Sequence, residues 1–77
     1  MKSLAMFAPG ERGTVRDLRV NGSMGQRLME MGFLPGAAVE FVRSAPLGDP
    51  IEVILGGSHL AIRRRDAAHI VVEGTEG

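Results

Sequence analysis

A single helix with a marked end limits what this chain can fold into. Met24, Leu28 and Met31 fall at i, i+4 and i+7, so they share one face of a predicted helix. Gly32 follows at the point where a glycine can adopt the left-handed conformation that ends many helices. A helix of about three turns is marginal in water by itself. The rest of the chain must therefore cover its apolar face, and the rest of the chain is predicted to form strands.

The clearest of these strand signals is a hairpin. Residues 51–55 and 58–62 alternate in polarity on either side of a Gly-Gly pair, which is typical of two antiparallel strands joined by a tight turn. The same alternation leaves Ile54 on the outside. The residues expected to face the core are Ile51, Val53, Leu55, Leu60 and Ile62.

The remaining segments carry weaker patterns. Residues 38–44 alternate, which predicts a strand with Val39 and Phe41 on its inner face. Residues 14–20 predict a strand whose imperfect alternation indicates a bulge. The other expected elements are a packed lead-in of Leu4, Met6 and Phe7, a loop at 45–50, a helical turn at 63–68, and a last strand at 69–73 before a frayed tail.

The length and composition of the chain exclude several classes of protein. Its 77 residues are enough for one domain, 1–77 with a core of about 4–73. The chain has no cysteine, so a disulfide and a thiolate zinc site are excluded. Nine basic residues balance nine acidic ones, which favours neither nucleic acid nor an anionic membrane as a partner. No signal segment or apolar run of about 18 residues occurs, so we expect a cytoplasmic protein without membrane insertion.

About five short strands and one helix predict a mainly β fold. Eleven glycines among 77 residues suit a small, strongly bent barrel with tight corners, in which the helix covers one opening. The residues expected to be critical for this fold are Leu28, Met31, Gly32, Pro35 and Gly36.

Two motifs now carry a family likeness. Residues 27–36, RLMEMGFLPG, and residues 45–51, APLGDPI, occur in this order in one short chain, with Pro-Gly-Glu at 9–11 ahead of them. Over about residues 4–73 the sequence resembles the FeoA family, the small partner of the bacterial ferrous iron transporter. The resemblance implies an SH3-like barrel with one inserted helix and a cytoplasmic location. It also implies a supporting role in iron uptake through FeoB, a membrane protein with a cytosolic GTPase domain.

The residues do not form a recognisable catalytic or metal-binding set. His59 and His69 lie ten residues apart without clustered carboxylates. Asp17, Asp49 and Asp66 belong to separate predicted elements, and no phosphate-binding or dinucleotide-binding glycine motif is present. We therefore expect a non-enzyme with no cofactor and no metal site.

The basic run Arg63-Arg64-Arg65 is the main argument for nucleic-acid binding, and it is weak. DNA-binding proteins commonly make about 6 to 10 phosphate contacts, whereas this run offers three cations that Asp66 partly neutralises. No tyrosine or tryptophan is present to stack on bases. We expect a solvated turn and no nucleic-acid partner.

Docking onto another protein is the function that the residues favour. Met29 lies off the apolar stripe of the helix, Leu47 lies in a loop, and Ile54 has the wrong parity for the core, so these three are candidates for partner contact. Gly48 and Asp49 belong to the same loop as Leu47, and loops on rigid scaffolds often carry function. The expected partner is a FeoB-like protein. The same apolar groups are equally compatible with a homo-oligomer.

A regulatory interaction module is the alternative. FeoA-like domains also occur attached to iron-dependent repressors, which use such domains beside a DNA-binding part. This chain has no helix-turn-helix pattern. A free-standing accessory protein is therefore the favoured interpretation.

Overall fold

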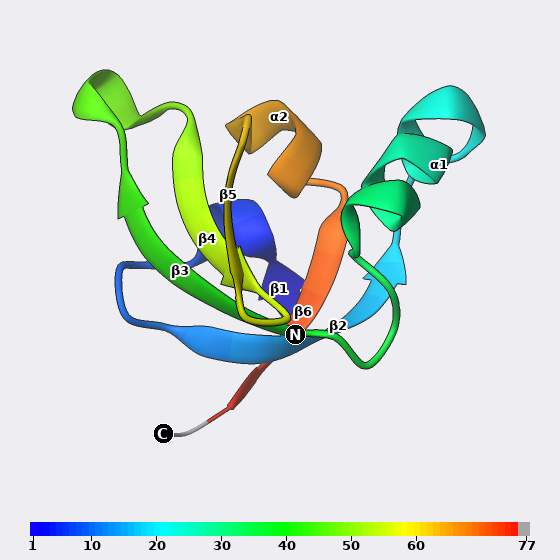
Figure 1. Ribbon diagram of the computed structural model, residues 1–77, viewed down its shortest axis with the longest axis horizontal. Coiled ribbons are helices and arrows are strands. Elements are labelled where there is room, and N and C mark those ends of the chain that lie inside the picture. Colours follow the sequence, from blue (N-terminus) through cyan, green and yellow to red (C-terminus); the bar gives the residue numbers. More distant parts are fainter. Residues whose placement is uncertain (76–77) are drawn as a thin grey trace.

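One antiparallel sheet organises residues 1–75, the part of the chain that the computed structural model describes (Figure 1). Within these residues the sheet has six strands in the order β1-β6-β2-β3-β4-β5. The strands are β1 (Lys2–Ser3), β2 (Arg12–Leu18), β3 (Ala38–Ser44), β4 (Ile51–Leu55), β5 (Ser58–Ile62) and β6 (Ile70–Thr75). The helical elements are η1 (Leu4–Met6), α1 (Gly22–Met31), η2 (Pro46–Gly48) and α2 (Arg64–Ala67).

The predicted mainly β fold is confirmed. The predicted number of strands, about five, was one too few. β3, β4 and β5 occupy the predicted ranges, and the β4–β5 hairpin turns at Gly56 and Gly57. The bulge predicted in β2 is present, because its register with β6 shifts between Val15 and Asp17. The missed strand is β1, whose two residues pair with Val71 and Val72 of β6 and are too few to show alternation. The predicted tail partly belongs to β6, and residues 76–77 lie outside the described part.

An apolar core that includes three phenylalanines fills the concave side of the bent sheet, between the sheet, α1 and η1. Every predicted inward residue of the hairpin is buried except Leu60, which is partly buried and packs against the core. Leu4 and Phe7 are buried as expected, but the prediction for Met6 was wrong, since its side chain is 70% exposed. The largest fully buried side chains are Phe33, Phe41, Leu4, Leu28, Ile51, Ile70, Val15, Val53 and Val72.

Helix α1 contributes Leu28 to this core and ends at the predicted glycine. Leu28 has no exposed area, and Met24 and Met31 are partly buried beside it. Gly32 has φ 111°, and its N–H donates to Met29 O while the N–H of Phe33 donates to Leu28 O. These two bonds form the double cap that a left-handed residue permits at a helix end. The glycine therefore sets where the chain leaves the helix and turns toward β3.

Candidate docking surface

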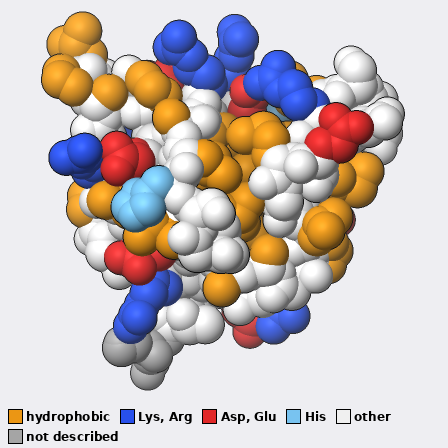
Figure 2. Space-filling view, viewed as in Figure 1, with side chains coloured by type: hydrophobic (Ala, Val, Ile, Leu, Met, Phe, Trp, Pro, Cys, Tyr) orange, Lys and Arg blue, Asp and Glu red, His pale blue; other side chains and the backbone are white. Residues whose placement is uncertain are grey.

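The loop between β3 and β4 presents the most exposed large apolar side chain of the described residues. Leu47 is fully exposed, whereas Met29 on α1 is 46% exposed and Leu34 is 49% exposed. In Figure 2 apolar side chains project at the upper left, over the loop that carries η2 in Figure 1. A leucine in this position buries nothing within the chain and is available to another molecule.

The backbone at Leu47 has an unusual conformation. Leu47 has φ 73° and ψ 4°, and the N–H of Gly48 donates to Ala45 O at 2.8 Å. This is the geometry of a type II turn, with Pro46 at its second position and Leu47 at its third, where glycine or asparagine is usual. A left-handed conformation costs a leucine about 1–2 kcal/mol. The loop therefore holds an apolar side chain outward at a cost in stability.

Arg64 of α2 holds this loop from its inner side. Its Nε donates to Gly48 O at 2.6 Å, and its Nη2 donates to Ser44 Oγ at 2.9 Å. Its Nη1 donates to Ala5 O at 2.7 Å, which ties the loop to η1. The backbone N–H of Arg64 donates to Asp49 Oδ1 at 3.0 Å. The prediction of a solvated arginine turn was thus wrong for Arg64, the middle member of the run.

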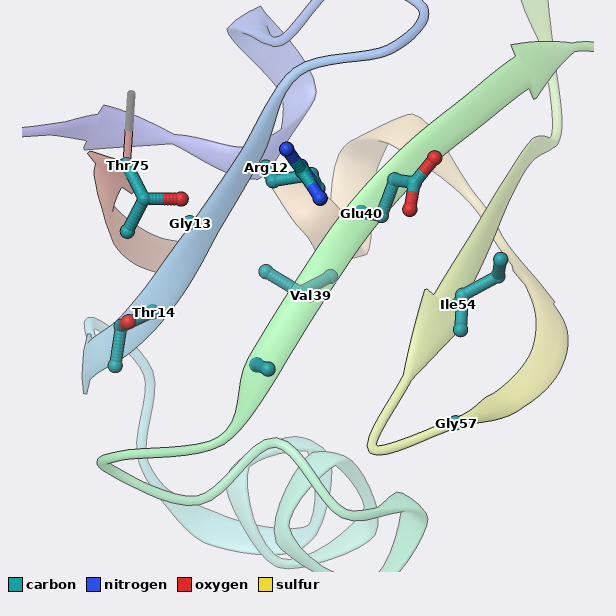
Figure 3. A pocket seen from close by; sticks show the side chains of 9 residues that line it. Arg12, Gly13, Thr14, Val39, Glu40, Ile54, Gly57 and Thr75 are labelled. Carbon is teal, nitrogen blue, oxygen red and sulfur yellow. The ribbon is translucent and has the colours of Figure 1, made fainter. Parts of the chain in front are cut away.

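Ile54 lies on the outer face of β4, as its parity predicted, but it is only partly exposed. It lines a groove of about 420 Å³ whose walls come mainly from β2 and β3, and Figure 3 shows its side chain beside those of Glu40 and Val39. The other lining residues are Arg12, Gly13, Thr14, Ala38, Gly57 and Thr75. Arg12, Thr14, Glu40 and Ile54 alternate with buried neighbours along their strands, so the groove lies mainly on the outer face of the sheet.

The structure does not bring the predicted contact residues into one patch. Leu47, Gly48 and Asp49 share the β3–β4 loop, which lies at one side of the view in Figure 1, while α1 with Met29 lies at the other side. Ile54 belongs to the groove on the outer face. The loop is the one candidate region to which three predicted residues contribute, and Arg64 is the residue that sequence reasoning missed there.

The acidic residue of α2 has a structural role. Asp66 is 2% exposed, and its Oδ2 accepts from Arg27 Nη2 of α1 at 3.3 Å. Its Oδ1 makes no hydrogen bond within the described part of the chain. Asp66 therefore links α2 to α1 and is not part of the exposed basic surface.

The histidines lie apart from any cluster of metal ligands. His59 is on the edge strand β5, with its Nδ1 3.7 Å from Glu52 Oε1, and no group of three or more histidine, aspartate or glutamate side chains within residues 1–75 could hold a metal ion. None of the helices within residues 1–75 combines the length and the apolar character that crossing a membrane requires.

The strongly bent antiparallel sheet, covered by one helix, is the architecture of a small SH3-like domain. Its family follows from the sequence comparison: the FeoA domain model matches residues 2–74, and the chain belongs to that family. The predicted SH3-like fold and the predicted family are both confirmed.

Relatives of known structure or curated name agree with this assignment. The chain is 34% identical over 70 residues to a fusion of Fe(2+) transport protein A with the Fe(2+) transporter FeoB from Porphyromonas gingivalis. That match covers 91% of this chain and 8% of the relative, so the chain spans less than a tenth of that protein. The solution structure of iron(II) transport protein A from Clostridium thermocellum is 39% identical with a TM-score of 0.88, and the match covers 94% of this chain and 44% of that one.

A third relative names the fold. The crystal structure of FeoA from Stenotrophomonas maltophilia, described as a prokaryotic SH3 domain protein complexed with zinc, is 27% identical with a TM-score of 0.82. The match covers 95% of this chain and 91% of that chain. A manganese-dependent transcriptional repressor also superposes, with a TM-score of 0.87 over 96% of this chain and 36% of its own length. Its identity is 17%, so this likeness shows a shared fold alone.

Proposed function

We propose that this chain is a non-catalytic accessory protein of ferrous iron uptake, and that it docks through its β3–β4 loop onto the cytosolic part of a FeoB-type transporter. The support for the partner is the fusion protein of Porphyromonas gingivalis, in which a relative of this chain is covalently joined to FeoB. Covalent fusion keeps two domains at high effective concentration, which is useful when the two act together.

The observation that carries the proposal is Leu47. Its side chain contributes nothing to the core, and its backbone occupies a conformation that glycine would adopt at lower cost. Strained residues of this kind cluster at functional sites, where the strain serves binding or catalysis. In the proposal this leucine serves a contact outside the chain, in which a pocket of the partner buries its side chain.

Gly48 and Asp49 shape this loop. Gly48 has φ 90°, which a side chain would disfavour, and its carbonyl accepts from Arg64. Asp49 is exposed, with one carboxylate oxygen accepting from the backbone of α2. In the proposal they set the direction of Leu47, while Met29 and Ile54 supply, at most, secondary contacts.

A titration of isotope-labelled protein with the cytosolic domain of FeoB tests this assignment. Backbone signals of residues 45–50 and of α2 are expected to shift, and Leu47→Ala is expected to weaken binding by about 30-fold or more, as for an interface anchor worth about 2 kcal/mol. Leu34→Ala is the matched control, because Leu34 is an exposed leucine that lies outside the loop. Equal affinity of the Leu47 and Leu34 variants would refute the assignment.

Self-association is checked by sedimentation of the free protein at several concentrations. A homo-oligomer that disappears in the Leu47→Ala variant would mean that the loop contacts a second copy, and the heterologous docking would then have to be measured with the monomer. A mass that stays at one chain over the whole range leaves the loop free for the transporter.

A further inference from the structure

We propose that Arg64 is a positioning residue that holds the β3–β4 loop in its docking conformation before any partner arrives, and that the loop fits an apolar pocket bordered by carboxylates. The proposal rests on the function proposed above. It assigns a role to a side chain that no sequence pattern separates from its two neighbours, Arg63 and Arg65.

The three guanidinium hydrogen bonds of Arg64 join three separate segments of the chain. One goes to the loop at Gly48, one to the end of β3 at Ser44, and one to η1 at Ala5. A guanidinium presents five donors in one plane, so a single arginine can hold three acceptors in fixed directions. The cation also lies 5.9 Å from the ring centroid of Phe41, which is buried. Arg64 therefore fixes the loop against the body of the domain.

All of these acceptors are uncharged. Arg64 forms no ion pair with a carboxylate in the described part of the chain, and its side chain donates to two carbonyl oxygens and one hydroxyl. Hydrogen bonds from a cation are stronger than those from a neutral donor. The positive charge of Arg64 thus holds the backbone of the β3–β4 loop in place. Because the turn at Leu47 is already ordered in the free protein, binding a partner does not carry the entropic cost of ordering it.

The residues on either side of Arg64 indicate the chemistry of the partner. Arg63 is exposed, and the side chain of Arg65 is 83% exposed with its Nε 3.9 Å from Asp66. Figure 2 shows Lys and Arg side chains gathered at the top of the molecule, over α2 and next to the apolar projection of the loop. An apolar tip flanked by cations complements an apolar pocket with aspartate or glutamate at its rim.

A protein pocket is favoured over an anionic membrane. Nine basic residues balance nine acidic ones, so the whole molecule is not drawn toward anionic lipid. One exposed leucine beside two exposed arginines is also a small contribution compared with the two signals that stable membrane anchoring needs.

The test compares Arg64→Lys with Arg65→Lys in the full chain. Both variants keep the charge, but a lysine at 64 cannot hold three acceptors in fixed directions. We expect the NMR order parameters of the Leu47 and Gly48 amides in the free protein to fall below about 0.6 in Arg64→Lys and to stay near about 0.85 in Arg65→Lys. A loop that stays rigid in Arg64→Lys would overturn the positioning role. If Arg64→Lys does not fold, Ser44→Ala removes one acceptor and gives the same readout with a smaller change.

Binding measurements separate this inference from the proposed function. With the FeoB cytosolic domain, Arg64→Lys is expected to lose about tenfold in affinity, and the double variant Arg63→Glu/Arg65→Glu is expected to bind more slowly at low salt. Suppose that the loop becomes mobile in Arg64→Lys but Leu47→Ala does not change the affinity for the FeoB domain. The positioning role of Arg64 would then stand, and docking through Leu47 would be refuted. Binding of the wild type to phosphatidylserine vesicles but not to the FeoB domain would overturn the protein pocket.

Discussion

At the scale of single residues, the left-handed backbone of Leu47 lowers the stability of the fold, while the proposed docking requires its side chain. Replacing it by glycine removes a left-handed strain of about 1–2 kcal/mol, which the greater freedom of glycine in the unfolded chain offsets by about 0.5–1 kcal/mol. We therefore expect Leu47→Gly to raise the free energy of unfolding by about 0.5–1 kcal/mol in urea titrations, while it weakens docking. A destabilised Leu47→Gly variant would show that the leucine serves the fold.

Glu11 makes the free energy of unfolding depend on pH in the acidic range. The N–H of Ala8 donates to Glu11 Oε1 at 2.6 Å and Lys2 Nζ donates to Oε2 at 3.0 Å, and both contacts lower the pKa of Glu11 below its ordinary value of 4.5. A carboxylate whose pKa is lower in the folded state than in the unfolded state stabilises the folded state at pH values above its unfolded pKa. This contribution to stability is lost as the pH falls through the folded-state pKa. Glu11→Gln is thus expected to flatten the decline of unfolding free energy below about pH 4.5, measured by denaturation at several pH values. An unchanged acid profile would contradict it.

At the scale of elements, α1 is limited by how closely it approaches the preceding segment. Gly25 is buried, and a Cβ added there would lie 2.8 Å from the carbonyl oxygen of Val20, a backbone atom that cannot move aside easily. Helix propensity alone predicts that Gly25→Ala stabilises by about 0.5–1 kcal/mol. We expect the opposite sign, a loss of about 1–3 kcal/mol in thermal or urea unfolding, because of the overpacking.

The neighbouring exposed position supplies the control for this change. Gln26→Ala adds a good helix former on the solvent side of the same turn and is expected to alter the unfolding free energy by less than about 0.5 kcal/mol. Stabilisation by Gly25→Ala would mean that the helix can shift away from Val20.

The elements themselves were predictable where one local pattern decides them. The hairpin of β4 and β5 and the end of α1 at Gly32 follow from alternation, a Gly-Gly pair and a glycine after an apolar stripe. Strand β1 was missed because two residues are too few to show an alternation of polar and apolar side chains. This strand is recognisable only from its pairing with β6. Boundaries of β2 also shifted, from 14–20 to Arg12–Leu18, because pairing with both neighbours decides them.

The candidate docking surface was predictable only in part, because it too depends on contacts that the fold creates. Leu47 could be identified because it is an apolar residue in a loop rich in proline and glycine. Its left-handed backbone could not, since the usual rule assigns that conformation to a glycine or asparagine. The role of Arg64 could not either, because three consecutive arginines look alike until Ala5, Ser44 and Gly48 are brought together by the fold.

At the scale of the whole molecule, the core is small, so the free energy of unfolding is low enough for one core substitution to unfold the domain. A domain of 77 residues is expected to have about 4–11 kcal/mol of stability, and Leu28 is fully buried at its centre. Leu28→Ala is expected to cost about 2–5 kcal/mol, which approaches the total. Urea titration of this variant should show a much lower midpoint, or an unfolded chain.

The residue after Leu28 is the control for this loss. Met29→Ala changes a half-exposed side chain on the same helix and is expected to cost less than about 0.5 kcal/mol. Similar midpoints for the two variants would mean that α1 contributes little to the core.

The conformation at Leu47 has a consequence for how such a chain changes over generations. Glycine at this position would suit the isolated domain better, so under the proposed docking it is selection on the contact that keeps a leucine there. Lineages that have lost the transporter should therefore replace it with glycine or asparagine sooner than they alter the buried residues, and a survey of genomes would reveal that order of decay.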